Sequence, residues 1–278
     1  MLTQLIVWLS TVVTPCAEVV LWPIAVMPGW ASATLVAAVT SVLMLAVFKV
    51  TSNQAAIRRV RNDIKANMLA LSLFKDSVGV GLRAQGRILL AAGRLLALSI
   101  VPMLIMLPPT CLLLGQLGLW YQARPLRVGE EAVVTVYLAG DAAEALPEVE
   151  LAGSGDWAPT GSPVRVPPRR MICWNVQAKA PGRHRLSFWI GDAEFDKELA
   201  VGDGFMPTSQ RRPEWSWTAA LLHPRETPFA ANSPVQSIEV AYPGRSSWTS
   251  GTDSWLVYWF VVSLLAAFAA KPLLRVDL

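Results

Sequence analysis

The stretch Leu95–Tyr121, LLALSIVPMLIMLPPTCLLLGQLGLWY, decides the fold of this chain because it carries no charged residue from end to end. A helix needs about 20 apolar residues to cross the hydrocarbon of a bilayer, so this stretch is long enough to span one. Pro102, Pro108 and Pro109 each remove a backbone donor, which lipid tolerates only where neighbouring groups satisfy the freed carbonyls. We therefore predict a proline-bearing span at 95–121 that packs against other helices.

The composition places the whole chain among membrane proteins. Of its 278 residues, 53% are hydrophobic and only 16% are charged, a balance unlike that of a soluble domain. The net charge of +4 is unevenly spread, since residues 49–94 hold nine Lys or Arg against two acids, whereas residues 121–254 hold thirteen against sixteen. The basic surplus therefore lies in one segment.

Two further apolar segments resemble spans. Residues 31–50 form an apolar run that is closed by Lys49, and residues 255–270 form a second run that is followed by Lys271. Residues 1–30 are also apolar, but they are broken by prolines and contain Glu18 as their only charge. We favour an interfacial helix for 1–30, and a true span is the alternative.

The segment 51–94 predicts a basic helical hairpin with a turn near 75–81. Apolar residues from Ile57 to Leu71 recur at helical spacing, and Gly79 and Gly81 interrupt the pattern before it resumes. Its basic side chains are expected to be either a solvated face or contacts to anionic lipid headgroups. The candidates are Arg58, Arg59, Arg61, Lys65, Arg83 and Arg87.

The basic hairpin also predicts the topology, because basic loops between spans stay in the cytoplasm. All twelve tryptophans lie outside 31–119, and Trp30, Trp120 and Trp255 fall at predicted outer span ends. We expect a multi-pass protein of a bacterial inner (cytoplasmic) membrane with its N-terminus outside and its C-terminus inside. The predicted order is an outer-face interfacial helix at 1–30, spans at 31–50, 95–121 and 255–270, the cytoplasmic hairpin at 51–94, an extracytoplasmic β-sandwich at 122–203, an outer-surface connector at 204–254 and a cytoplasmic tail at 271–278.

After Tyr121 the pattern changes to short alternating strands that are separated by glycine-containing turns. This spacing over about 80 residues is typical of a small sandwich. The fold class that we predict is therefore an integral membrane α-helical protein, with three spans plus a cytoplasmic helical hairpin, that carries an extracytoplasmic all-β immunoglobulin-like sandwich. The strands are expected at 132–138, 147–151, 171–176, 184–190 and 195–201. Within the connector we expect a short helix near 215–222 and a strand at 235–241.

No pattern of an enzyme is found in the sequence. The two histidines, His184 and His223, lie near no nucleophile pattern. The acids at 192, 194, 196 and 198 have the period of a strand, which spreads carboxylates along one face instead of converging them on a metal. We therefore expect no metal, no cofactor and no specific nucleic-acid motif.

The segment Pro102-Met103-Leu104 followed by Pro108 resembles the opening of a core span in the YidC-type membrane insertase superfamily, where that span also follows a basic cytoplasmic hairpin. The resemblance implies a polar groove in the membrane that receives client helices, with Lys49 as its positive residue. Membrane lipids and client membrane proteins are the implied partners, with the ribosome or another membrane subunit as further candidates. The groove candidates are Lys49, Thr40, Ser41, Met103, Met106, Thr110 and Gln116.

Two alternatives stay open at this point. Ser and Thr in spans more often make helix-packing contacts or bond to their own backbone than line a groove, and Lys49 has the position of an ordinary boundary lysine. A membrane-anchored adaptor that acts through its outer sandwich is the competing class of function.

The topology can be tested with single cysteines in a variant that lacks Cys16, Cys111 and Cys173. We expect a membrane-impermeant thiol reagent added to intact cells to label cysteines at Ser154 and Ser246, because both are predicted to be outside, and not at Ser77. Labelling of Ser77 from outside would contradict the predicted orientation.

Overall fold

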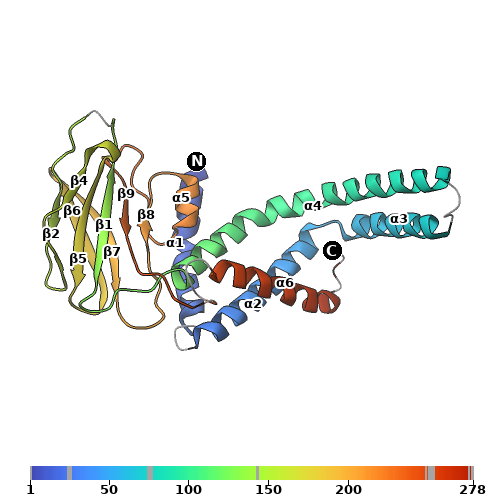
Figure 1. Cartoon of the computed structure of the whole chain (residues 1–278), viewed down its shortest axis with the longest axis horizontal. Coiled ribbons are helices and arrows are strands. Elements are labelled where there is room, and N and C mark those ends of the chain that lie inside the picture. Colours follow the sequence, from blue (N-terminus) through green and yellow to red (C-terminus); the bar gives the residue numbers. More distant parts are fainter. Residues whose placement is uncertain are drawn as a thin grey trace. The chain divides into compact units, whose positions relative to one another are not determined.

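The computed structural model describes residues 2–23, 27–73, 78–141, 144–247, 249, 254–274 and 276 (Figure 1). The chain forms two compact units, one of residues 1–33 and 111–258 and the other of residues 34–110 and 259–278. Among the described residues, four helices are long and apolar enough to cross a membrane: Thr3–Leu21, Gly29–Thr51, Gly79–Tyr121 and Trp255–Leu274. The chain therefore combines membrane-type helices with a separate antiparallel β-sheet region.

The long helices include every predicted span. Helix α2 (Gly29–Thr51) covers the first, the second half of α4 (Val78–Tyr121) covers the second, and α6 (Trp255–Leu274) covers the third. The fourth is α1 (Leu2–Leu21), which lies in the segment predicted to be interfacial. Helix α6 continues to Leu274, which is beyond its predicted end at 270.

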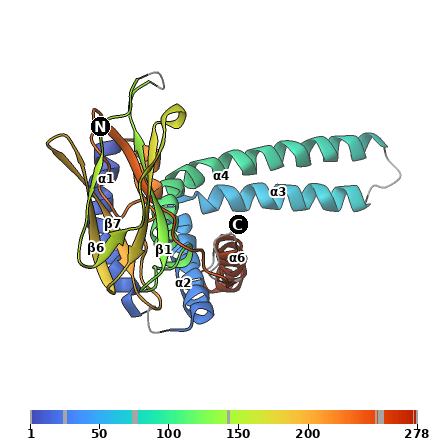
Figure 2. The same cartoon turned by 60° about the vertical axis from the view of Figure 1, so that its left-hand side comes forward.

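Helix α4 continues through all three of its prolines. Its 44 residues extend for about 66 Å at 1.5 Å per residue, roughly twice the thickness of bilayer hydrocarbon. Only half of α4 can therefore lie in lipid, and the other half forms the predicted hairpin with α3 (Gln54–Leu73), which lies beside it in both views (Figures 1 and 2).

Both helices of the hairpin bury apolar residues. Ile57 of α3 is 1% exposed, and Ala84 and Ala91 of α4 are also buried. Asn53 precedes α3, and its side-chain oxygen accepts a hydrogen bond from the backbone N–H of Ala56 at 3.0 Å, which stabilises the helix start. Of the predicted turn, residues 75–77 lie outside the described residues.

The β-region consists of two antiparallel sheets. One has the strand order β3-β5-β1-β9-β8, with β4 also paired to β5, and the other has the order β2-β6-β7. The strands are β1 Glu131–Leu138, β2 Glu150–Ala152, β3 Trp157–Pro159, β4 Val164–Val166, β5 Met171–Ala178, β6 Gly182–Ile190, β7 Ala193–Val201, β8 Arg211–Arg212 and β9 Val235–Val240.

Both sheets contribute to one hydrophobic core. Every second residue of β1 and of β5 is buried, as expected for strands with one face on a core. Trp174 of β5 meets Phe188 of β6 edge to face, with ring centroids 5.3 Å apart. Aromatic pairs of this kind add about 0.5–1.5 kcal/mol beyond the area that they bury.

Strand β9 comes from 204–254, the segment predicted to be a connector, and pairs with β1 along the register from Val134↔Val240 to Leu138↔Val235. Ile238 of β9 is fully buried in the core. The same segment contains the short helix α5 (Trp217–Leu222). Residues beyond the predicted domain end at 203 thus complete the sheet, because β9 pairs with the edge of β1 that β5 does not occupy.

Two soluble fragments test this role of β9. We expect residues 122–243 to give a cooperative β-sheet circular dichroism spectrum, and residues 122–203 to lack one because β1 would lose its β9 partner. Within the longer fragment, Ile238→Ala should lower the free energy of unfolding by about 2–5 kcal/mol, as measured by urea titration. A folded 122–203 fragment would show that β9 is dispensable.

Candidate functional site

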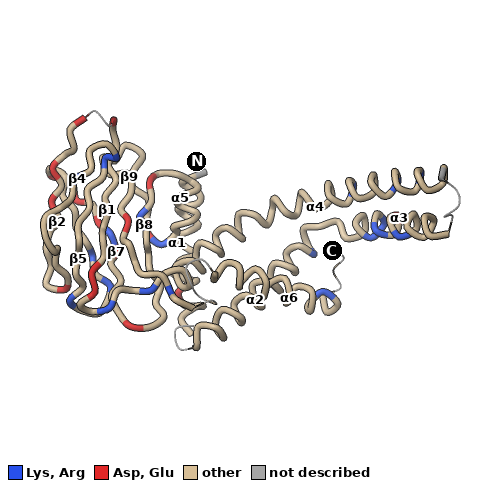
Figure 3. The backbone as a smooth tube through the Cα atoms, viewed as in Figure 1, with Lys and Arg blue, Asp and Glu red and all other residues tan. Residues whose placement is uncertain are grey.

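The predicted basic residues lie on the hairpin, and charge is sparse elsewhere on the long helices (Figure 3). The side chains of Arg58, Arg59 and Lys65 on α3, and of Arg83 and Arg87 on α4, are exposed, whereas Arg61 is half-buried. The hairpin therefore presents several cations to solvent or to a partner.

An apolar stripe accompanies these cations along α4. Leu82, Leu89, Leu96 and Met103 follow one another at intervals of seven residues, and their side chains are 65%, 73%, 70% and 65% exposed. Seven residues are nearly two helical turns, with a drift of only about 20°, so these residues share one face of α4. We call these four residues the α4 stripe. It continues without a break from the hairpin into the proline-bearing span.

The polar residues of the first and third spans are used in helix packing. The Ser41 hydroxyl donates a hydrogen bond to the backbone oxygen of Ser263 at 2.6 Å, and the Ser263 hydroxyl donates one to Ala37 at 3.3 Å. Thr40 donates to the carbonyl oxygen of Val36 in its own helix at 2.7 Å. The two serine hydroxyls therefore join α2 to α6, whereas Thr40 bonds within α2. All three hydroxyls donate to backbone oxygens, as polar groups in lipid must be satisfied internally.

The remaining predicted groove residues in this unit are on α4 and at the end of α2. Thr110 donates a hydrogen bond to the Met106 carbonyl oxygen at 2.7 Å, and its hydroxyl lies 3.7 Å from the sulfur of Met44 on α2. Met103 and Lys49 are exposed, and Met106 is half-buried. Thr110 thus has packing partners, whereas Met103 is open to an apolar partner.

Gln116 belongs to the other unit. Its side-chain N–H donates a hydrogen bond to the Thr14 hydroxyl of α1 at 2.9 Å, and that hydroxyl donates to the Pro224 carbonyl oxygen at 3.1 Å. Gln116 is only 4% exposed. The predicted groove residues therefore divide between the two units, and Gln116 fixes α1 to the β-containing unit.

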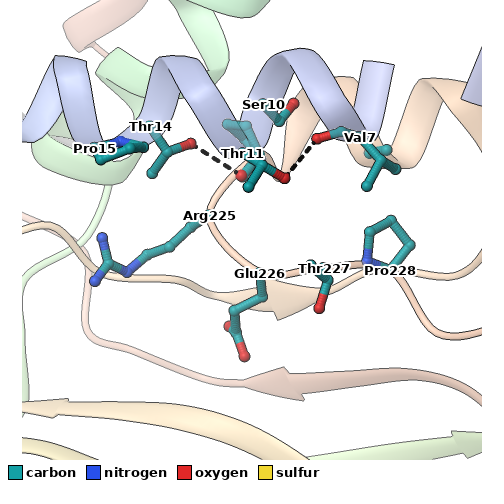
Figure 4. Close-up of a pocket in the computed structure, with 11 residues that line it drawn as sticks. Val7, Ser10, Thr11, Thr14, Pro15, Arg225, Glu226, Thr227 and Pro228 are labelled. Carbon is teal, nitrogen blue, oxygen red and sulfur yellow. Dashed lines mark hydrogen bonds between the residues drawn. The ribbon is translucent and has the colours of Figure 1, made fainter. Parts of the chain in front are cut away.

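A cavity that no sequence pattern indicated lies between α1 and the segment 224–228 (Figure 4). It has a volume of about 160 Å³. The Ser10 hydroxyl on its wall is buried, and none of the described residues forms a hydrogen bond with it. The cavity is lined by Val7, Ser10, Thr11, Thr14, Pro15, Ala220, Pro224, Arg225, Glu226, Thr227 and Pro228.

An ionic network lies beside this cavity. The Arg225 guanidinium donates to both carboxylate oxygens of Glu198 on β7, at 2.8 and 3.1 Å, and also to Glu18 of α1. Arg183 of β6 contacts the same Glu18 oxygen at 3.3 Å. Burial by itself lowers the pKa of Arg225, but its hydrogen bonds to Glu198 and Glu18 raise that pKa overall. The network therefore stays charged and ties α1 to two strands.

A second ion pair is buried one residue away. Lys197 of β7 is fully buried, and its ammonium donates to Glu226 and, at 2.6 Å, to the carbonyl oxygen of Ser209. Burial lowers the pKa of Lys197, whereas Glu226 opposes that shift. Strand alternation could have located this residue, since it places Lys197 on the face opposite to the acids at 192–198.

Two of those acids, Asp196 and Glu198, pair with arginines. Asp196 contacts Arg212 and, at 3.7 Å, Arg185, while Glu198 binds Arg225. Among the described residues there is no group of three or more His, Cys, Asp or Glu side chains placed to hold a metal ion.

Comparisons with protein-family models, curated proteins and solved structures found no match to this chain. The function is therefore inferred from the geometry of the long helices and of the β-region.

The buried Lys197–Glu226 pair allows a stability test in the fragment 122–243. We expect Glu226→Gln to lower the free energy of unfolding by about 3–5 kcal/mol, because it leaves the Lys197 charge buried without its counter-ion. The double variant Lys197→Met, Glu226→Gln removes both charges and should recover most of the loss. A single variant within about 0.5 kcal/mol of the parent in urea unfolding would show that the pair does not matter.

Proposed function

We propose that this protein is an insertase-like membrane chaperone that binds apolar client segments on its hairpin and passes them along α4 into the membrane. The α4 stripe carries this proposal. It presents an exposed apolar side chain at every second turn from Leu82 to Met103, and it runs along one uninterrupted helix.

The capture step follows from the surface of the hairpin. Large apolar side chains on a helix in water are usually turned toward a core, and here several are exposed among the cations. Burying one leucine against a client helix contributes about 1.5–3 kcal/mol, so a few of them give useful affinity. Among the described residues of the hairpin, the large apolar side chains that are exposed outside the stripe are Met68, Leu69, Leu73, Val80 and Leu90.

The transfer step uses the span half of α4. Ile100, Leu104 and Leu107 are between 49% and 60% exposed, so the apolar surface widens where the helix enters the span. The polar residues of the spans are occupied with packing, so the proposed client path follows the stripe. Lys49, exposed at the end of α2, is the charge that would attract an acidic flank of a client at the inner boundary.

The finer architecture is part of the same proposal. We place α2, α4 and α6 as the spans, the N-terminus outside, the C-terminus inside and the β-region outside, in a bacterial inner membrane. The basic hairpin supports this orientation. The order of span, basic hairpin, proline-bearing span and last span supports membership of the YidC-type superfamily. Two sheets on one core, with Trp174 against Phe188, support an immunoglobulin-like sandwich.

An anchored adaptor is the second candidate function. The β-containing unit exposes Val164, Trp189 and Trp215, which are 61%, 38% and 40% exposed, and aromatic residues of this kind often anchor protein partners. This function predicts one constant partner on the β-region and no need for the hairpin.

Site-specific photo-crosslinking in cells distinguishes the two functions. We expect a crosslinker at Leu89 or Met103 to trap many different nascent membrane proteins, because both face outward on the stripe, and one at the buried Ala91 to trap few. Crosslinkers at Met106 and Thr110 test how far the path extends. The double variant Leu82→Gln, Leu89→Gln should reduce capture about tenfold or more, because it removes two leucine side chains that the client would bury. The neighbouring substitution Gln85→Ala should not reduce capture.

Reversing the boundary charge with Lys49→Glu should also weaken capture, because charges are poorly screened at the edge of the hydrocarbon. Crosslinks from Leu89 and Met103 to lipid and one constant protein only, unchanged by these variants, would support the adaptor and exclude the chaperone.

A further inference from the structure

Helix α1 has its polar and apolar faces reversed relative to a helix on a water-soluble protein. Its buried residues are Ile6, Ser10 and Thr14, which follow one another at intervals of four on the face toward α5 and the segment 224–228. A helix on a soluble protein would turn its hydroxyl side chains to water and its large apolar ones to the core. The large apolar residues Leu5, Trp8, Val12, Val19 and Val20 instead face outward and are 58%, 66%, 49%, 76% and 73% exposed. The exposed polar residues Gln4 and Thr11 lie at one edge of this apolar face.

The polar face of α1 is bound to the β-containing unit over most of the helix. Ile6 packs in a cluster with Ala220 and Leu221 of α5, and Glu18, near the other end, pairs with Arg225 and Arg183. The distance along α1 between Ile6 and Glu18 is about 18 Å at 1.5 Å per residue. The contact is therefore a whole helical face and not one end.

This length of contact decides how α1 meets a membrane. If α1 crossed the bilayer, its partners along those 18 Å would enter the hydrocarbon, among them Arg183, Arg225 and Glu198. Charged side chains at the bilayer centre are expensive. If α1 lay in water, Trp8 and four aliphatic side chains would be exposed on one face. A helix in the plane of the interface avoids both costs, with its apolar face sunk about 5–10 Å into lipid.

We infer that α1 lies flat in the outer leaflet of the membrane, with Leu5, Trp8, Val12 and Val19 in lipid, and that Glu18 holds the β-region to it. We choose lipid as the partner because a membrane-type helix follows α1 closely in the sequence. This helix, α2, begins at Gly29, shortly after α1 ends. Trp22 and Trp30, in the same unit, are 70% and 64% exposed, as is typical of rings at the membrane interface. This inference does not depend on the chaperone activity.

Nitroxide labels on the full-length protein in lipid nanodiscs test the inference. Single cysteines at Leu5, Val12, Cys16 and Val19 would be labelled in a background without the other native cysteines. Continuous-wave electron paramagnetic resonance then compares relaxation by oxygen, which partitions into lipid, with relaxation by a water-soluble nickel chelate. A label at Ser10, on the protein-facing side, is the matched control and should be shielded from both reagents.

We expect all four outward labels to favour oxygen to the same moderate degree, which corresponds to one shallow depth along the helix. A maximum at Val12 that falls toward Leu5 and Val19 would show that α1 crosses the bilayer and would overturn the inference. Equal access of the nickel chelate to the four labels and to a label at the exposed Ser154 would also overturn it, because α1 would then be in water.

Discussion

The length of α4 is the constraint on which the rest of the structure depends. A single helix of 44 residues is about twice as long as bilayer hydrocarbon is thick, so in the arrangement that we propose one half finds its partner in water while the other half packs in lipid. The hairpin with α3 provides the first environment, and α2, through the contact between Met44 and Thr110, contributes to the second. The α4 stripe crosses from one to the other, which is why we connect capture in water with transfer into lipid.

The β-containing unit is stabilised by a different kind of interaction. Its core is aromatic and aliphatic, whereas its junction with α1 combines an apolar cluster around Ile6 with ionic contacts of Glu18, Arg225 and Glu198. Arg225 is 7% exposed in its side chain, and buried charges of this kind are costly unless every partner is in place. A junction with such requirements specifies one position of α1 on the domain. Such a junction is suited to hold α1 in the orientation that we infer, with its large apolar side chains toward lipid.

Much of the helical part could be predicted from the sequence, because the signals are local. A run of apolar residues of sufficient length predicts a span without knowledge of its neighbours, and a basic amphipathic segment between two such runs predicts a helical hairpin. The alternation in β1 and β5 was visible for the same reason. Strand β9 could be recognised as a strand, but its membership in the sheet with β1 could not, since pairing between residues 134 and 240 is a long-range contact.

The sequence by itself determined which segments are apolar enough for lipid and where the cations accumulate, because both are properties of composition and periodicity. The tertiary structure decided the partners of the polar side chains. Ser41 and Ser263 bond to backbone between helices, and Gln116 binds Thr14 in the other unit, so the predicted groove set was divided. Lys197 and Glu226 likewise meet only after folding. A hydroxyl, amide or charge is satisfied by whichever atom folding brings within about 3 Å, and that atom is usually far away in the sequence.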